Sequence, residues 1–175
     1  MVFKKKPSHP SREVIKGIFL LISVGAVYYP STQAGFIWDD DSFFTRNPIM
    51  VSPDALKRFW FSMDPPDYFP LVSTNLWIQR QIWELNPLGY HLVNIAFHAL
   101  NAVLFWRILL HVKIPGAWIA AMAFALHPIQ VESVSWSTQI KTVQSACFYL
   151  LSLLLYLRSG TNLNSKIYAI SLFLF

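Results

Sequence analysis

Three consecutive aspartates, Asp39 to Asp41, come a few residues after the first apolar stretch of this sequence. A carboxylate is costly to desolvate beside a bilayer, so acidic residues held there are candidates for a functional site. One of them could act as a general base, with an acidic neighbour that adjusts its basicity or holds a cation. The run could equally be a solvated loop in which Asp41 or Ser42 caps a following helix. The aspartates alone leave these two interpretations balanced.

A second group of polar residues is spaced three, four and three positions apart: His91, Asn94, His98 and Asn101. This spacing places them on one face of a helix. They could form hydrogen bonds between helices, as polar residues in membrane bundles commonly do, or they could line a polar cavity. His91 and His98 lie about 10 Å apart along a helix axis, so we do not expect them to share a metal ion.

A third group follows another apolar stretch and contains His127, Glu132 and Lys141. These side chains could bind an anionic group or position a substrate. Alternatively, His127 bonds to a helix terminus and Lys141 lies at headgroup depth. The sequence has no metalloprotease spacing, no phosphate-binding glycine loop and no Gly-x-Ser-x-Gly elbow, which excludes those classes of site.

The elements that must position these residues are predicted to be membrane helices. Of the 175 residues, 54% are hydrophobic and only 13% are charged, whereas a soluble domain carries about a quarter charged residues. We therefore expect an all-α, multi-pass transmembrane bundle. The single cysteine, Cys147, allows no disulfide within the chain and is expected to be a small buried core residue.

Apolar runs of membrane-spanning length predict about four spans and the start of a fifth. They cover residues 14–29, 89–110, 116–131 and 143–157, and the fifth begins near Ile167. We divide the chain into a basic tail, 1–13, and a membrane domain, 14–175. Because the sequence stops within an apolar run at Phe175, we expect a longer protein whose C-terminal remainder is missing, with the fragment inactive by itself.

Charge patterning predicts the orientation. Nine of the 14 Lys and Arg residues lie in the N-terminal segment and in the turns at 107–113 and 158–166, whereas eight of the nine acids lie in the other two loops. The positive-inside rule then places the N-terminus in the cytoplasm and the loop 30–88, with the aspartates, on the other face. Within that loop, residues 71–85 predict an interfacial helix. The external loops lack an Asn-x-Ser/Thr sequon, which favours a bacterial inner membrane over the endoplasmic reticulum.

Several blocks occur in an order that resembles one family. They are Phe36-Ile37-Trp38-Asp39-Asp40-Asp41, Pro70-Leu71, Asn86-Pro87-Leu88-Gly89-Tyr90-His91 with Asn94 and His98, and His127-Pro128-Ile129-Gln130-Val131-Glu132 followed by Lys141. The series is similar to the membrane half of the transmembrane and tetratricopeptide-repeat O-mannosyltransferases and their bacterial relatives. These are glycosyltransferases of the GT-C superfamily, which use lipid-linked sugars.

The resemblance implies an inverting glycosyltransferase that moves a mannose-like sugar from a polyprenyl phosphate to an acceptor hydroxyl, Ser or Thr of a protein. Asp39 matches the catalytic acid of the family and Asp40 its acidic neighbour. His91, His127, Glu132 and Lys141 match blocks that would bind the substrate or donor. Phe69 stands where the family often has Arg, so Arg80 or Lys141 would have to bind the donor phosphate.

The same resemblance leaves two other functions open. The chain could be a non-catalytic scaffold for an external repeat domain, which Phe69 and Thr142 favour, or a transporter of lipid-linked sugars. We expect no required cofactor and no metal site, although Asp39 and Asp40 could hold a divalent cation. The expected partners are the bilayer, the sugar donor and a protein acceptor, and not nucleic acid.

Overall fold

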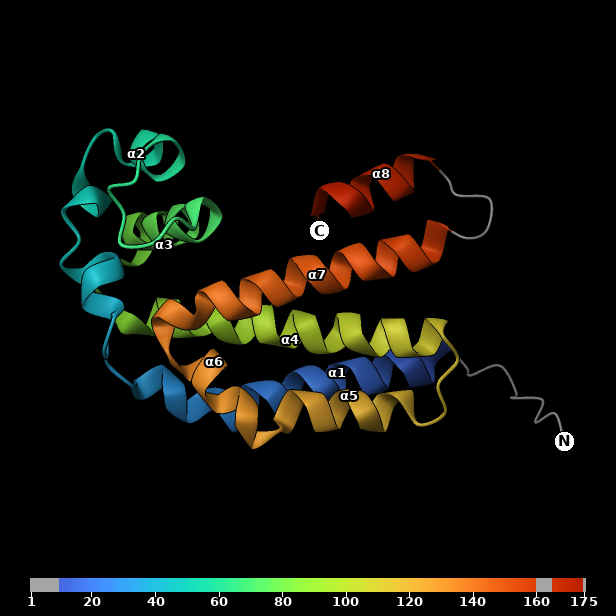
Figure 1. The fold of residues 1–175 in the computed structure, drawn as a ribbon. Coiled ribbons are helices and arrows are strands. Elements are labelled where there is room, and N and C mark those ends of the chain that lie inside the picture. Colours follow the sequence, from blue (N-terminus) through green and yellow to red (C-terminus); the bar gives the residue numbers. More distant parts are fainter. Residues whose placement is uncertain (1–9, 160–164, 175) are drawn as a thin grey trace, which may run out of the picture.

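The computed structural model describes residues 10–159 and 165–174, and all regular elements in these ranges are helices. Four of them run side by side and form a bundle (Figure 1). They are α1 (Pro10–Tyr28), α4 (Pro87–His111), α5 (Ala117–Leu126) and α7 (Ile140–Ser159). α4 is central, because α1, α5 and α7 all pack against it. The predicted all-α class is confirmed.

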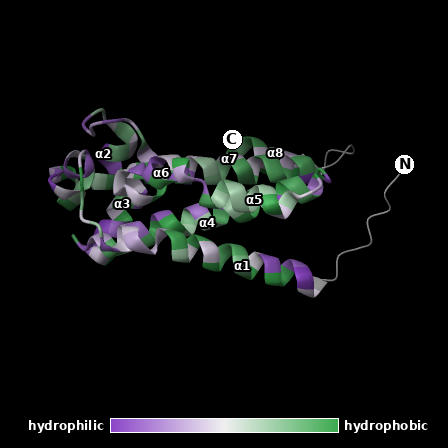
Figure 2. Cartoon of the chain, turned by 90° about the horizontal axis from the view of Figure 1, so that it is seen from below, coloured by the Kyte–Doolittle hydropathy of each residue, from purple (hydrophilic) through white to green (hydrophobic). Residues whose placement is uncertain are grey.

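Within the described residues, three helical segments are long and apolar enough to cross a membrane, and they contain the first, second and fourth predicted spans. The span-length segments are Ser11–Gln33, Pro87–His111 and Ser137–Ser159. Figure 2 shows hydrophobic residues along the middle of the bundle and hydrophilic residues toward its ends. The multi-pass membrane architecture is thus supported for three helices. Cys147 is buried in α7, as expected for a core residue.

The third predicted span, residues 116–131, is not confirmed as a helix of span length. The helix in this region, α5, has ten residues, a length of about 15 Å, which is half of the roughly 30 Å that a span must cross. It ends at Leu126 because Pro128 disfavours helical backbone in the residue before it, and His127 adopts an extended conformation (φ −68°, ψ 131°). The expected fifth span is represented by a ten-residue helix, α8 (Ser165–Leu174), which packs on α7.

Short elements gather at the end of the bundle where α4 and α7 begin (Figure 1). α2 (Ala55–Phe61), α3 (Pro70–Trp83) and α6 (Val131–Ser135) are the α-helices there. The others are the 3₁₀ turns Tyr29–Gln33, Pro48–Val51, Pro128–Gln130 and Ser137–Gln139 and a π-helical turn, Asp41–Thr45. We call this end the outer end; the opposite end carries the start of α1.

α3 confirms the helix predicted over residues 71–85. Pro70 begins it, since proline is favoured in the first helical turn. One side buries residues such as Leu76 against the bundle, while Leu71, Ile78 and Ile82 stay exposed. The helix therefore leaves apolar side chains on its outer surface, where an interfacial helix would contact the membrane.

The junction between α3 and α4 explains the glycine in the Asn86-Pro87-Leu88-Gly89 block. The Asn86 side chain accepts a hydrogen bond from the Leu88 amide and caps α4. A Cβ atom added at Gly89 would overlap the Trp83 ring. Only glycine lets the end of α3 approach the first turn of α4 this closely.

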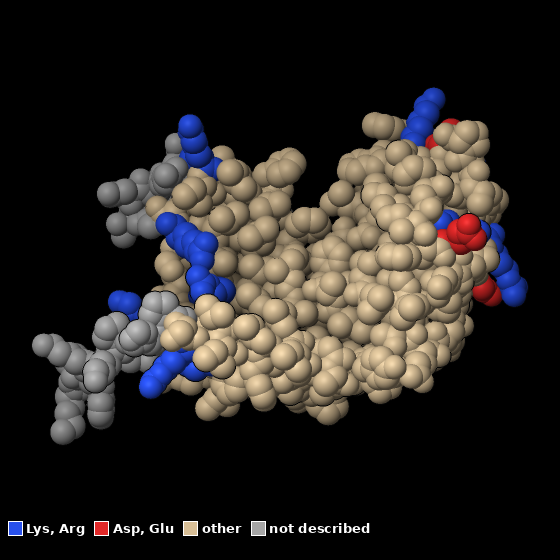
Figure 3. Space-filling view, turned by 180° about the vertical axis from the view of Figure 1, so that it is seen from behind, with Lys and Arg blue, Asp and Glu red and all other residues tan. Residues whose placement is uncertain are grey.

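Charged residues are divided between the two ends of the bundle. Figure 3 shows Lys and Arg without acidic residues at one end of the visible face, and both signs at the other. The basic group contains Arg107, Lys113 and Arg158, at or beyond the C-terminal ends of α4 and α7. The fold therefore places the basic residues at the C-terminal ends of α4 and α7 at the same end of the bundle, as the positive-inside argument requires of them.

Candidate active site at the outer end of the bundle

The backbone reaches the aspartates through a strained turn. Trp38 has φ of 50°, in the left-handed region that is unusual for a bulky residue. The Asp40 amide donates to the Ile37 carbonyl (3.1 Å), and the Ile37 amide donates to the Asp40 carboxylate (2.9 Å). These two bonds close the turn around Trp38. Strain of this kind costs about 1–3 kcal/mol and clusters at functional sites.

Asp40 is buried, with 1% of its surface exposed. Besides the Ile37 amide, its carboxylate accepts hydrogen bonds from the Thr138 amide (2.9 Å) and from the Thr138 hydroxyl. These bonds connect the loop 30–88 to the 3₁₀ turn Ser137–Gln139, which precedes α7. Asp40 therefore has a structural position, and both of its oxygens are occupied.

Asp39 differs from its neighbour in each of these respects. It is half-buried, and among the described residues its carboxylate takes part in no hydrogen bond or ion pair. Its backbone carbonyl accepts from the Phe43 amide and the Ser42 hydroxyl (both 3.0 Å). The backbone is held while the carboxylate stays available to a substrate.

Lys141, at the start of α7, lies close to the same turn. Its ammonium group is 5.3 Å from the centre of the Phe43 ring and 6.0 Å from that of Trp136, within the range of cation–π attraction. Trp136 also packs edge-on against Trp38, with ring centres 4.8 Å apart. No acidic side chain pairs with Lys141 in the part of the chain that is described. We call Trp38, Asp39, Phe43, Trp136 and Lys141 the outer cluster.

The polar stripe on α4, comprising His91, Asn94, His98 and Asn101, is buried, with 1% of each residue exposed. Each side chain donates to a backbone carbonyl of a neighbouring segment. The acceptors are Ala34 for His91 (3.2 Å), Trp136 for Asn94 (2.8 Å), Ala125 for His98 (2.9 Å) and Val143 for Asn101 (2.8 Å). The interpretation as hydrogen bonding between elements is confirmed.

Some buried polar atoms near the outer end of the stripe have no partner within residues 10–159 and 165–174. They include His91 Nδ1, Asn94 Oδ1, Trp136 Nε1 and Ser137 Oγ. A buried polar atom without a partner costs about 1–3 kcal/mol. The region between α4 and the start of α7 thus contains atoms that could form hydrogen bonds with a bound polar group.

The remaining predicted residues are spread over the outer end. Arg80, on α3, is half-buried, and its Nε is buried without a partner among the described residues. The exposed His127 accepts the Ile129 amide through Nδ1 (3.2 Å), as the helix-terminus alternative predicts. Glu132 is exposed in α6 and makes no ion pair with the described part of the chain.

A divalent cation on Asp39 and Asp40 would have to replace the hydrogen bonds that Asp40 already makes. Across the described residues, no three His, Cys, Asp or Glu side chains gather in a way that could hold a metal ion. This geometry leaves the Asp39 carboxylate able to accept a proton and the Lys141 ammonium group able to bind an anionic group.

Sequence reasoning missed three members of the site. Thr138 anchors Asp40, and Phe43 and Trp136 position Lys141. Trp136 lies between Glu132 and Lys141, and the position of a tryptophan near the predicted membrane surface was a signal. No feature of the sequence pointed to Thr138, because a threonine near the start of a helix commonly bonds to the nearby backbone.

Together the fold and the site define a multi-span membrane protein. At one end of its bundle lie a carboxylate, Asp39, and an ammonium group, Lys141, that make no ion pair with the described residues. The sequence is similar to curated protein O-mannosyl-transferases: it is 31% identical to TMTC3 of Mus musculus over 87% of this chain, and 30% identical to TMTC2 of Mus musculus over 76%. It is 26% identical to Tmtc3 of Drosophila melanogaster over 86% of the chain. This chain is homologous to the protein O-mannosyl-transferases.

These matches cover 18%, 17% and 20% of the three relatives, so the chain spans about a fifth of their length. No family model and no solved structure matches the chain. The resemblance identified from the Asp39, His91 and His127 blocks is confirmed.

Proposed function

We propose that the protein containing this chain transfers a mannose-like sugar from a polyprenyl phosphate to a Ser or Thr hydroxyl of a protein on the non-cytoplasmic face. One observation carries the proposal. In a chain homologous to protein O-mannosyl-transferases, Asp39 comes a few residues after a candidate membrane span, and its carboxylate has no partner among the described residues. It lies next to the contact between Trp38 and Trp136, and the Lys141 ammonium group lies over the Trp136 ring. The basic residues at the opposite end support this orientation.

In the proposed reaction, Asp39 acts as the general base. Its carboxylate takes the proton of the acceptor hydroxyl as the oxygen attacks the anomeric carbon. The bond between that carbon and the phosphate oxygen breaks, and its electron pair leaves with the polyprenyl phosphate. Direct displacement inverts the anomeric centre. Asp40 holds the turn that presents Asp39 and makes no bond to substrate.

The cations have the complementary role. Lys141, held over Phe43 and Trp136, would stabilise the charge that develops on the leaving phosphate. Arg80 supplies a second cation from α3, and its Nε, which has no partner among the described residues, could bind the same group. We place the exposed apolar side of α3 at the membrane surface, where it would guide the lipid tail of the donor.

The test is transfer of radiolabelled mannose from polyprenyl-phosphate mannose to a Thr-rich peptide by the protein in lipid nanodiscs. We expect label on the peptide, with no transfer from the water-soluble nucleotide-linked sugar. Transfer from the nucleotide sugar alone would contradict the proposed donor. The product anomer, determined by NMR, tests inversion.

A scaffold function is the second candidate. Phe69 occupies the position before Pro70, where the family that this sequence resembles often has Arg. This site then lacks that cation. A scaffold predicts that transfer is absent although the protein is folded, and that replacing Asp39 changes no phenotype. A lipid-linked-sugar transporter predicts instead that donor crosses vesicle membranes in the Asp39→Ala variant as fast as in the wild type.

A further inference from the structure

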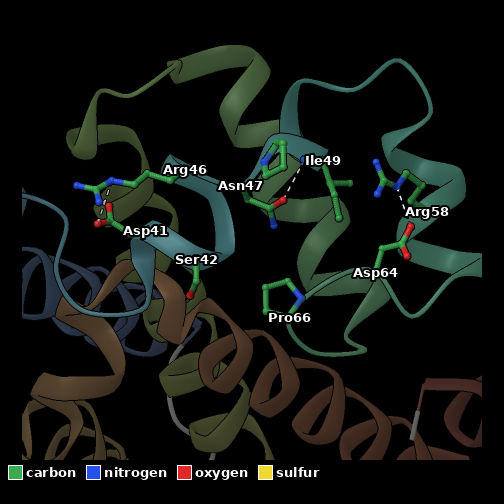
Figure 4. A pocket seen from close by; sticks show the side chains of 9 residues that line it. Asp41, Ser42, Arg46, Asn47, Ile49, Arg58, Asp64 and Pro66 are labelled. Atoms are coloured by element: carbon green, nitrogen blue, oxygen red, sulfur yellow. Dashed lines mark hydrogen bonds and ion pairs between the residues drawn. The ribbon is translucent and has the colours of Figure 1, made fainter.

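The first external loop contains an open pocket of about 490 Å³ that the proposed reaction does not use. Its volume lies in the range of about 300–1,000 Å³ typical of ligand sites. The pocket is lined by Asp41, Ser42, Arg46, Asn47, Pro48, Ile49, Arg58, Asp64 and Pro66. Figure 4 shows this pocket with the α7 side of the bundle below it.

Two arginine–aspartate pairs lie on opposite sides of the pocket (Figure 4). Arg46 is 3.4 Å from Asp41, and Arg58 donates to Asp64 at 3.0 Å. The side chains of both pairs are substantially solvent-exposed. An exposed pair contributes only about 0–1 kcal/mol, so these four groups can turn toward a ligand at little cost.

The wall between the pairs is apolar and rigidly built. Pro48, Ile49 and Pro66 supply it. The Asn47 side chain accepts from the Ile49 amide (3.0 Å) and donates to the Phe43 carbonyl (3.1 Å), which fixes the turn. A pre-formed wall of this kind lowers the entropic cost of binding.

The pocket adjoins the turn that carries the candidate base, although the Asp39 side chain is not among its lining residues. The Ser42 hydroxyl, which lines the pocket, donates to the Asp39 backbone carbonyl at 3.0 Å. A ligand bound here therefore lies beside the turn that presents the Asp39 carboxylate. The position suits the substrate that must deliver a hydroxyl to Asp39.

The chemistry of the lining selects among the possible ligands. Two arginines and two aspartates give no net charge, so the pocket lacks the excess of cations that would favour a phosphate. Its charged sides would be costly to bury against an isoprenoid tail. None of the nine lining residues is aromatic, so no ring face is available for a sugar. An extended peptide offers donors, acceptors and apolar side chains together, which matches this lining.

We propose that this pocket binds the segment of the polypeptide acceptor that flanks the reacting Ser or Thr. This assignment rests on the proposed transfer reaction and adds the acceptor site to it. The two Arg–Asp pairs bind backbone and side-chain polar groups of the acceptor. Pro48, Ile49 and Pro66 hold its apolar side chains, so proline and small aliphatic residues are favoured near the modified residue.

Steady-state kinetics of two matched variants on α2 test the assignment. Arg58→Ala removes a pocket cation, whereas Lys57→Ala removes an exposed cation that does not line the pocket. We expect Arg58→Ala to raise the KM for a Thr- and Pro-rich peptide about tenfold, the effect of about 1.4 kcal/mol of binding. The kcat and the KM for polyprenyl-phosphate mannose should be unchanged, and Lys57→Ala should stay within about twofold. An unchanged peptide KM, or a raised donor KM instead, overturns the assignment.

A binding measurement separates this assignment from the reaction itself. A photo-crosslinking amino acid placed at Pro66 should form an adduct with the labelled peptide in nanodiscs, and Arg58→Ala should weaken it. Adduct formation without any transfer by the wild type would contradict the reaction and leave the pocket assignment standing. Transfer without an adduct, or an adduct abolished by free mannose but not by excess peptide, would refute the peptide pocket.

Discussion

The polar stripe on α4 and the outer cluster lie close together but use their polar groups in opposite ways. Every member of the stripe is buried and donates to a backbone carbonyl. In the outer cluster, Asp39 and Lys141 make no ion pair with described residues, and only aromatic rings hold the lysine. The polar side chains of the stripe join neighbouring elements, whereas the two charged groups of the outer cluster are left available.

The neighbours Asp39 and Asp40 show this contrast across a single peptide bond. Asp40 is fixed by Ile37 and Thr138, whereas the Asp39 carboxylate has no partner in the described chain. Two acids of the same type thus differ in role because only one of them is enclosed by donors. If the contrast holds, substitutions in the outer cluster lower the transfer rate, whereas a substitution in the polar stripe lowers only stability.

The largest effect is expected from Asp39→Asn. A general base accelerates a reaction by about 10²–10⁴-fold. We therefore expect the kcat for transfer to fall about 10³-fold while folding is unchanged. Radiolabel transfer in nanodiscs measures the rate, and Asp67→Asn, an exposed acid of the same loop, is the matched control. If Asp39→Asn retained activity within a few-fold, Asp39 would not be the base.

A smaller loss is expected from Lys141→Met. Removing one group that stabilises developing charge costs about 10²-fold in rate, because the leaving phosphate loses its cation. Lys141→Arg keeps the charge and should recover part of the activity. Exposed Lys57→Met serves as control. Equal activity of Lys141→Met and wild type would mean that the lysine only packs on Phe43 and Trp136.

The smallest effect is expected from Asn101→Leu in the stripe. This change removes the 2.8 Å bond to Val143, and such bonds in membrane proteins contribute about 0.6 kcal/mol on average. Thermal unfolding should shift slightly, with transfer rate preserved. A lost transfer rate without lower stability would show that the stripe lines a substrate cavity and that its role is not purely structural.

Local patterns predicted much of the fold. The length of the apolar runs identified α1, α4 and α7, and the three- and four-residue spacing placed the stripe on one buried face. The mixed polarity of residues 71–85 identified α3. These features depend on residues near one another in sequence, where periodicity carries the information.

Prediction from the sequence failed at a local break in a helix and at contacts between residues distant in the chain. Hydropathy continued the third span through Val131, but Pro128 ended the helix at Leu126. The bonds between Asp40 and Thr138 join residues 98 positions apart, and no local pattern indicates such a pair. The aspartate run therefore predicted a candidate site, whereas the division of roles between Asp39 and Asp40 required the fold.

Thermal unfolding of Asp40→Ala beside Asp39→Ala, in the same nanodiscs, tests that division most directly and requires no knowledge of the substrate. Hydrogen bonds to a charged group contribute about 1.5–3 kcal/mol, and Asp40→Ala also leaves Thr138 without its acceptor. We predict that Asp40→Ala loses about 3 kcal/mol of stability, whereas Asp39→Ala stays within about 0.5 kcal/mol of the wild type. Equal losses, or a larger loss for Asp39→Ala, would contradict the account.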